Sequence, residues 1–313
     1  MELTVNTVNF STKKFSWNTT LTLSHNKNSV KALTGEAVQL YEARFGFNQN
    51  THRIAVGEPL GQFYGYITEG LYQVDDFNYD ASTQTYTLKD GIPYHGDKGR
   101  IRPGMWKFKN LAGDDNVIDE NDKTVIGNAQ PKFYGGLNNS FTYKGFDLSI
   151  FLTFSYGNEV LNATKLVTSK VGSLNYNALD MMNSSNRWMT INSDVQKVTD
   201  PGELAALNAG KTVAAYHDAQ QGDNYIHSWA VEDASYLKLS NVTLGYTFPK
   251  NLIARVGLKN LRLYATGNNL LTWTKYSGFD PEVSTMKSGL TPGVDFGAYP
   301  LSRSFIFGLN VAF

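Results

Sequence analysis

The chain has 313 residues, with 28 Lys or Arg balanced by 28 Asp or Glu and no cysteine. This length can bury a sizeable core, the zero net charge gives no argument for a nucleic-acid partner, and the lack of cysteine excludes disulfide scaffolds and cysteine metal sites. A mean hydropathy of −0.33 is typical of a soluble protein, although a transmembrane β-barrel is equally polar because every second residue faces its lumen. No segment approaches the roughly 18 apolar residues of a membrane-spanning helix.

The first residues already have the pattern of a β-strand. Residues 1–7 contain neither the basic segment nor the apolar segment of a signal peptide. Residues 2–10 alternate weakly between apolar and polar side chains, and residues 15–25 alternate clearly. We therefore expect this chain to be the C-terminal part of a longer protein, starting within a series of strands.

A long irregular region follows, from about residue 26 to residue 130, and we expect short local strands within it. Alternation returns at residues 133–143. After a turn at residues 144–145, residues 146–156 form the clearest strand of the chain. The apolar face of this strand consists of Phe146, Leu148, Ile150, Leu152, Phe154 and Tyr156.

A second long polar region spans about residues 157–233 and contains a predicted short helix near residues 202–208. The next predicted strand, residues 237–248, changes its apolar register between Leu239 and Val242. One extra residue in a strand has this effect, so the sequence predicts a β-bulge near Ser240 and Asn241.

The last predicted strands are residues 260–273 and 304–313. In the final strand the apolar face consists of Phe305, Phe307, Leu309, Val311 and Phe313. An exposed apolar edge strand promotes aggregation in water, whereas a strand that closes an outer-membrane barrel has to present such a face to lipid. The alternative is a final core strand in a soluble β-sandwich.

Short and long connections alternate along the chain. The short turns, at about residues 11–14, 144–145 and 249–259, fall on one side of the predicted sheet, and the long loops fall on the other. Outer-membrane barrels sort their connections in this way, with short turns at the periplasmic end and long loops at the extracellular end. A β-sandwich produces no such sorting.

The polar faces of the predicted strands carry Ser, Thr, Asn and Gly. Residues 15–25 and 133–143 contain no charged residue, and residues 146–156 contain only Asp147. A soluble sandwich would present Lys and Glu to water on these faces. We therefore predict an all-β fold in which one antiparallel meander, with sequence neighbours paired, forms part of a transmembrane barrel.

Five stretches of this sequence also resemble a known family. They are residues 126–139, 143–149, 234–246, 267–271 and 278–282. In this order they resemble the C-terminal barrel of SusC/RagA-type TonB-linked outer-membrane transporters. The Phe-ended final strand agrees with that resemblance.

The resemblance implies a 22-stranded barrel with long extracellular loops, a plug and a TonB box. About seven strands can be counted here and neither plug nor TonB box is present, so residues 1–313 would be the C-terminal part of the barrel. The implied function is TonB-energised import of an oligosaccharide or peptide ligand across a Gram-negative outer membrane. The implied partners are outer-membrane lipid, a SusD-like surface lipoprotein and TonB, which would bind the N-terminal part that this chain lacks.

Two other functions are compatible with the composition. A soluble secreted β-sandwich that binds glycans is the main alternative, and a passive porin-like barrel is a further one.

Five histidines are scattered without metal-ligand spacing, and no nucleophile elbow, P-loop or dinucleotide motif occurs. We therefore expect no enzymatic activity and no organic cofactor.

An acidic segment at residues 111–122 is similar to the calcium-like loop that this family usually carries. Its later positions keep Asp115, Asp119 and Asp122, but the first two ligand positions hold Leu111 and Gly113, which offer no side-chain oxygen. Calcium requires six or more oxygen ligands, so the sequence favours an acidic turn over a bound ion.

Aromatic side chains in the long loops could stack on sugar rings or hold peptides. The candidates are Tyr64, Tyr66, Tyr72, Trp106, Trp188 and Trp229. The alternative, which the sequence favours for any single one of them, is that these side chains pack the loops against one another.

Overall fold

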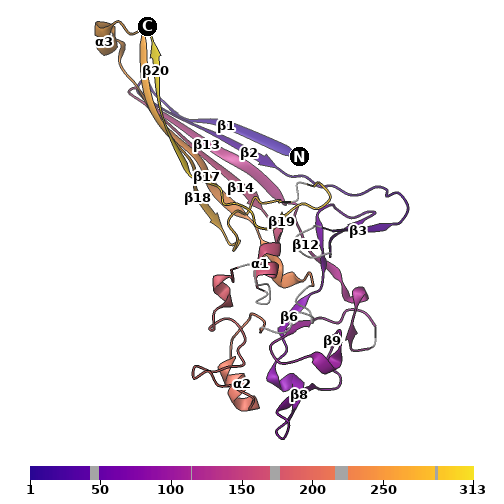
Figure 1. Cartoon of the computed structure of the whole chain (residues 1–313). Helices are drawn as coiled ribbons and strands as arrows, with labels where there is room; N and C mark the ends of the chain where they lie inside the picture. The colour runs from indigo at the N-terminus through magenta and orange to yellow at the C-terminus, as the bar shows by residue number, and fades with distance from the viewer. Residues whose placement is uncertain (43–48, 114, 170–176, 216–224, 286–287) are drawn as a thin grey trace.

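The computed structural model describes residues 1–42, 49–113, 115–169, 177–215, 225–285 and 288–313. Its main feature is one seven-stranded antiparallel sheet with the order β1-β2-β13-β14-β17-β18-β20 (Figure 1). These strands are β1 (Glu2–Ser11), β2 (Phe15–Ser24), β13 (Phe133–Tyr143), β14 (Phe146–Tyr156), β17 (Tyr236–Thr247), β18 (Asn260–Thr274) and β20 (Ser304–Ala312). The predicted meander is therefore confirmed, including the weakly alternating first strand.

The register of this sheet explains the apolar pattern of β17. Leu239 lies opposite Leu152 and Val242 lies opposite Ile150, while the register shifts between Leu239 and Asn241. The bulge keeps both apolar side chains on one face, as the sequence predicted.

The two ends of the sheet differ in their connections. The hairpins β1–β2, β13–β14 and β17–β18 all turn at the same end, where Figure 1 shows the short helix α3 (Lys250–Ile253) near the C-terminus. The long segments between β2 and β13, β14 and β17, and β18 and β20 all leave from the opposite end (Figure 1). No helix among the described residues is long and apolar enough to cross a membrane.

The long segments fold into small sheets and short helices, which we call the loop body. Its strands are β3 (Val38–Glu42), β4 (Asn50–Ala55), β5 (Gln62–Gly65), β6 (Thr68–Leu71), β7 (Phe77–Asp80), β8 (Thr85–Leu88), β9 (Tyr94–His95), β10 (Trp106–Phe108), β11 (Val117–Ile118), β12 (Thr124–Asn128), β15 (Glu159–Asn162), β16 (Val231–Asp233) and β19 (Val294–Asp295). Its helices are α1 (Ala163–Thr168), α2 (Pro201–Leu207) and the 3-10 turns η1 (Val74–Asp76), η2 (Lys98–Arg100), η3 (Glu120–Asp122), η4 (Asp180–Met182) and η5 (Ser228–Ala230).

Helix α2 confirms the helix predicted near residues 202–208. The Asp200 carboxylate accepts a hydrogen bond from the Glu203 amide at 3.0 Å, and Pro201 occupies the first helical position. Both features favour a helix start, because Asp satisfies a free amide and Pro has no amide to satisfy.

The loop body has its own apolar core, to which separate chain segments contribute. One cluster joins Tyr66, Trp106 and Phe108 from the first long segment to Trp188 and Leu204 from the second. A second cluster consists of Phe63, Leu161, Ala163, Leu166, Val167, Ile226, Ala230 and Val294, which come from all three long segments. The long connections therefore pack together as one body beyond the end of the sheet.

Candidate functional site

One face of the seven-stranded sheet is apolar and exposed. Cross-strand pairing puts Leu148, Leu244 and Phe307 in one row, and Ile150, Val242 and Phe305 in the next. Side chains of β20 are the most exposed of this face, with Phe305 at 67% and Phe307 at 81%. Apolar side chains this exposed in a continuous face mark a surface that contacts lipid or another protein.

Two rows of aromatic side chains border the apolar face. The row near the short turns is Phe15, Tyr143, Phe146 and Tyr246, and the row near the loop body is Phe133, Tyr156 and Trp273. Phe146 and Tyr156 are the first and last residues of the 11-residue strand β14. At ~3.4 Å per residue and a strand tilt of about 40°, the rows are roughly 26 Å apart, which matches the height of the apolar band of an outer-membrane barrel.

The opposite face of the sheet is polar and hydrogen-bonded across the strands. Thr243 and Thr266 hydroxyls lie 2.9 Å apart, and Arg262 pairs with Asp147 through Nη2–Oδ2 and Nε–Oδ1 distances of 2.6 and 3.0 Å. Gly245 lies between the two charged side chains, since a Cβ there would be 2.4 Å from Arg262 Nη2. The polar side chains of this face thus form hydrogen bonds and ion pairs with one another, as is typical of the face that lines a water-filled lumen.

A loop segment is anchored to this polar face. The Glu282 carboxylate accepts hydrogen bonds from the Tyr236 hydroxyl and from the Lys238 ammonium, both on β17. Lys238 is only 4% exposed, so its charge needs this partner. Beside the pair, a hollow of about 410 Å³ is lined by Tyr134, Glu159 and other residues of the sheet end and the loop body.

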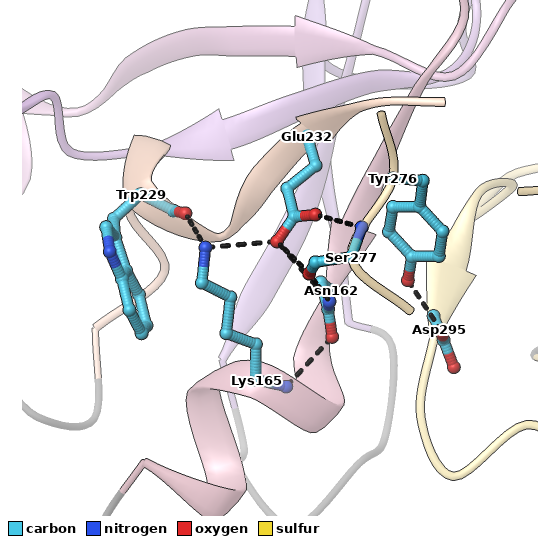
Figure 2. A network of polar contacts seen from close by, with 7 residues as sticks. All are labelled: Asn162, Lys165, Trp229, Glu232, Tyr276, Ser277 and Asp295. Carbon is cyan, nitrogen blue, oxygen red and sulfur yellow. Dashed lines mark hydrogen bonds and ion pairs between the residues drawn. The ribbon is translucent and has the colours of Figure 1, made fainter. Parts of the chain in front are cut away.

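A polar network in the loop body joins three chain segments (Figure 2). Lys165 Nζ of α1 is 3.0 Å from Glu232 Oε1 of β16, donates to the Trp229 carbonyl at 2.9 Å, and lies 4.0 Å from the centre of the Trp229 ring. Ser277 donates to Glu232 from its amide and its hydroxyl, at 2.9 Å each. The network therefore fixes α1 and the segment after β18 to β16.

Electrostatics favour the charged form of Glu232. Burial alone would raise the pKa of this carboxyl, but the hydrogen bonds from Ser277 and the positive charge of Lys165 outweigh it and lower the pKa. Tyr276 lies next to the network and donates to Asp295 Oδ2 at 2.6 Å; burial and this hydrogen bond raise the pKa of the Tyr276 hydroxyl. Tyr276 is therefore a neutral donor throughout the physiological range.

The network borders a hollow of about 300 Å³. The residues that line it are Asn162, Thr164, Lys165, Leu179, Asp180, Met181, Ser277, Gly278, Phe279, Asp295, Gly297 and Ala298. The polar groups of Asn162, Lys165 and Ser277 are engaged with Glu232, whereas Phe279 is 76% exposed. This mixture of exposed apolar area with a few fixed polar groups is typical of small-ligand pockets.

The aromatic candidates from the sequence occupy different positions. Tyr66, Tyr72, Trp106 and Trp188 are each at most 5% exposed and belong to the apolar clusters. Tyr64 and Trp229 are half-buried, and none of the six lines the 300 Å³ hollow. The buried four could reach a ligand only if the loop body rearranged, and a ligand role for any of the six stays a prediction.

The acidic loop satisfies its carboxylates internally. Asp122 accepts hydrogen bonds from the amides of Leu111, Ala112 and Asp119, at 2.6, 2.9 and 2.8 Å. Burial opposes ionisation, but these amides outweigh it and lower the pKa of Asp122. Asp119 and Asp115 accept from the amides of Asn121 and Val117.

A calcium role for Asp115, Asp119 and Asp122 stays a prediction, and the bonding of the loop gives it no support. Among the described residues, which leave out Asp114, no group of three or more acidic or histidine side chains is placed to hold a metal ion. With the carboxylates directed at backbone amides and two ligand positions lacking side-chain oxygens, the loop has the bonding of an acidic turn.

The fold and its surfaces were compared with known proteins. No family model matches the chain. TonB-dependent receptor P3 of Formosa agariphila is 33% identical over 319 residues, and TonB-dependent receptor SusC of Bacteroides thetaiotaomicron is 27% identical over 326 residues; each match covers the whole chain. Over its whole length the chain is therefore similar to TonB-dependent receptors, SusC among them. It covers 28% of the first relative's length and 26% of the second's.

Solved structures show the same fold as this chain. A structure of the RagAB peptide transporter superposes with a TM-score of 0.66 at 19% identity, over the whole chain and 28% of that structure's chain. The antiparallel sheet thus has the same fold as the matching part of that transporter's chain. The relatives are receptors and transporters rather than enzymes, in agreement with the sequence prediction.

The sequence did not predict the polar network of the loop body. Lys165 and Glu232 are 67 positions apart, and Ser277 is 45 positions beyond Glu232. No spacing rule links residues so distant. The one available signal was the stretch at residues 278–282, which carried part of the family resemblance and directly follows Ser277.

Proposed function

We propose that this chain forms the C-terminal part of the barrel wall of an outer-membrane nutrient importer of a Gram-negative type of cell. The observation that carries the proposal is the apolar band of the sheet, bounded by two aromatic rows roughly 26 Å apart. A single sheet with one lipid-like face and one polar face supports a barrel over a soluble β-sandwich, which would need two stacked sheets.

The polar face supports a hydrophilic ligand path. It presents Ser, Thr and Asn side chains and carries two ion pairs, Asp147–Arg262 and Lys238–Glu282. Neutral hydrogen-bonding groups suit ligands rich in hydroxyl or amide groups, so we propose an oligosaccharide or a peptide as the imported ligand. A peptide is what the RagAB transporter is named for, and this similarity makes peptides the first class to test.

Energy for import would come from TonB through a part of the protein outside this chain. Residues 1–313 offer a wall and a loop body; a plug that blocks the lumen has to be supplied from the rest of the receptor. The wall also needs partners along β1 and β20, because each unpaired backbone group in hydrocarbon costs several kcal/mol.

The barrel proposal is tested by expressing the full-length receptor and comparing it with residues 1–313 alone. We expect the full-length protein in the outer membrane, with heat-modifiable migration on a gel, and energy-dependent uptake of labelled peptides or oligosaccharides. We expect the isolated chain to aggregate or to fail to insert. A monomeric, detergent-free, cooperatively melting species from residues 1–313 would support the soluble glycan-binding sandwich instead.

We also propose that the loop body docks a SusD-like surface lipoprotein. The long segments have their own core and extend beyond the end of the sheet, where Figure 1 shows α2 and β8 farthest from it. Because residues 160–230 contribute to both apolar clusters, deleting them would unfold the loop body. A sharper test is a short charged insertion after Thr83, in the turn between β7 and β8, with the same insertion after Lys13 as the control.

The insertion after Thr83 should weaken co-purification of the lipoprotein and leave heat-modifiable migration unchanged. The insertion after Lys13 lies in a short turn at the opposite end of the sheet and should leave co-purification unchanged. Equal co-purification with both variants would count against docking at this end of the loop body.

A further inference from the structure

The short-turn end of the sheet carries a concentration of positive charge. We define the turn rim as residues 12–14, 144–145 and 248–259, which contain no Asp or Glu. Six cationic residues lie on it, all of them exposed: Lys13, Lys14, Lys144, Lys250, Arg255 and Lys259. Because the whole chain has zero net charge, the remainder carries an excess of carboxylates. The turn rim is thus a local excess of positive charge in a chain that is neutral as a whole.

These cations are not neutralised within the described part of the chain. None of the six pairs with a carboxylate among the described residues. The carboxylate that follows the second turn, Asp147, is held by Arg262 through two hydrogen bonds. The two first turns are joined directly, since the Lys144 amide donates to the Lys14 carbonyl at 3.3 Å. The lysines of these turns therefore form one surface.

Apolar side chains accompany the cations in the third turn. Helix α3 and the following η6 (Ala254–Val256) bury Ile253 and leave Leu252 53% and Val256 71% exposed. Gly257 ends this element with a φ of 76°, which lets the Leu258 amide return to the Ile253 carbonyl at 3.2 Å. An exposed Leu and Val among Lys and Arg make this short element amphipathic, as elements at a membrane surface are.

The rim also continues the aromatic row of the apolar face. The ring centroids of Phe146 and Tyr246 are 4.5 Å apart, and those of Tyr246 and Phe248 are 5.0 Å apart. Phe248 is itself the first rim residue of the third turn. Aromatic side chains of a barrel occupy the headgroup level of the bilayer, so the cations next to them lie at the depth of lipid phosphates.

We propose that the turn rim binds the headgroups of anionic phospholipids, with Leu252 and Val256 inserted at the headgroup level. The inference rests on the proposed function, in which this sheet spans the outer membrane with its short turns on the periplasmic side. The lysine and arginine side chains would contact lipid phosphates, and the leaflet facing the periplasm is the one within their reach. Each cation near an anionic lipid surface raises binding about fivefold.

The test measures which lipids surround the full-length receptor. The receptor is reconstituted into phosphatidylethanolamine vesicles that contain spin-labelled phosphatidylglycerol or spin-labelled phosphatidylcholine, and the fraction of motionally restricted label is compared. We expect a preference for phosphatidylglycerol of about fivefold or more, which decreases at high salt. Inorganic phosphate added at constant ionic strength should not reduce it.

The rim variant replaces all six cations with Gln. A control at the loop end replaces three exposed lysines, Lys27, Lys31 and Lys275, with Gln. Heat-modifiable migration verifies that each protein has folded and inserted. We expect the rim variant to lose most of the preference and the control to keep it. The same preference in all three proteins, or none in an inserted wild type, would overturn the inference while leaving the barrel proposal intact.

An independent measurement tests the apolar contact. In a Leu252→Trp variant, the emission gained relative to the wild type should be quenched by lipids brominated near the headgroup and protected from iodide in water. Quenching by iodide alone would place α3 in water and overturn the inference. Displacement of the lipid by inorganic phosphate would overturn it too, because the rim would then be a phosphate site. A wild type that does not insert at all would reject the proposed function and this inference together.

Discussion

The seven-stranded sheet and the loop body distribute their apolar side chains in opposite ways. In the sheet, Phe307 is 81% exposed and Phe305 is 67% exposed, on a face without a covering layer. In the loop body, Phe63 and Phe108 are fully buried within apolar clusters. One chain thus contains an ordinary core and an apolar outer surface.

This difference indicates that the loop body and the outer face of the sheet are adapted to different surroundings, water and lipid. A loop body in water gains free energy by removing apolar area from its surface, at roughly 25 cal/mol per Å². The sheet gains nothing from such burial if its outer face meets lipid, and its constraint is that every backbone group be paired. Hydrogen bonding along the strands therefore stabilises the sheet, while apolar packing and a few buried polar pairs stabilise the loop body.

The largest effect is expected where the loop body buries charge. Replacing Glu232 with Leu would leave the ammonium of Lys165, which is 8% exposed, without its carboxylate partner. Removing one partner of a buried pair typically costs about 3–5 kcal/mol. We expect faster proteolysis of the loop body in the full-length receptor, with unchanged heat-modifiable migration of the barrel.

The control for Glu232 is the exposed pair Lys98–Asp90, whose side chains are 36% and fully exposed. An Asp90→Asn variant should leave the stability of the loop body nearly unchanged, since exposed ion pairs are screened by water. Equal proteolysis of the two variants would show that the network does not hold the loop segments.

The next effect concerns the two faces of β14. Ile150 lies on the apolar face near the middle of the strand, and Ser149 lies on the polar face. Replacing Ile150 with Arg should reduce the free energy of unfolding in lipid vesicles by about 2–4 kcal/mol, because the charge would lie near the bilayer midplane. Ser149→Arg should cost less. Equal tolerance at the two positions would contradict the orientation of the sheet.

A pH-dependent effect is expected in the loop body alone. His52 is fully buried, and its Nε2 lies 2.9 Å from the Pro292 carbonyl; burial lowers its pKa to about 4, although that hydrogen bond raises it in part. The unfolded chain binds a proton below pH 6.5, whereas the folded chain does so only near pH 4. Stability should therefore fall by up to about 3 kcal/mol as the pH decreases from 6.5 to 4.

Urea unfolding of the loop body at several pH values, followed by tryptophan fluorescence, would measure this loss. A His52→Asn variant should be less stable at pH 7 and should lose most of the additional destabilisation between pH 6.5 and pH 4. An unchanged pH dependence in that variant would assign the effect to another group.

The same contrast explains what the sequence could predict. Alternation with a period of two is a local signal, and the bulge near Ser240 was visible because it broke that period. Short turns then fixed which strands pair. The sheet can therefore be predicted from local sequence. The same is true of α2, because Asp200 and Pro201 mark its start.

The loop body could not be predicted in this way, because its contacts are distant in sequence. His52 and Pro292 are 240 positions apart, and Lys165 and Glu232 are 67 positions apart. A loop aromatic such as Trp188 has the same local sequence signature whether it packs a core or faces a ligand. Its 2% exposure is a property of the assembled segments and has no counterpart in a periodic pattern.

The smallest effect is expected at Asn139, a polar residue on the apolar face. Asn139 lies between Thr19 and Ile150 in the cross-strand register, and its Oδ1 accepts hydrogen bonds from Trp17 Nε1 at 3.0 Å and from Thr19 Oγ1 at 2.7 Å. Replacing Asn139 with Leu would remove two hydrogen bonds and also remove an amide from the apolar band. Interior polar contacts of membrane proteins contribute on average about 0.6 kcal/mol, so the two changes nearly cancel and we expect a shift below about 1 kcal/mol. Equilibrium unfolding in vesicles, with Ile150→Arg measured beside it, would check this. A loss as large as that of Ile150→Arg would mean that this part of the face contacts protein rather than lipid.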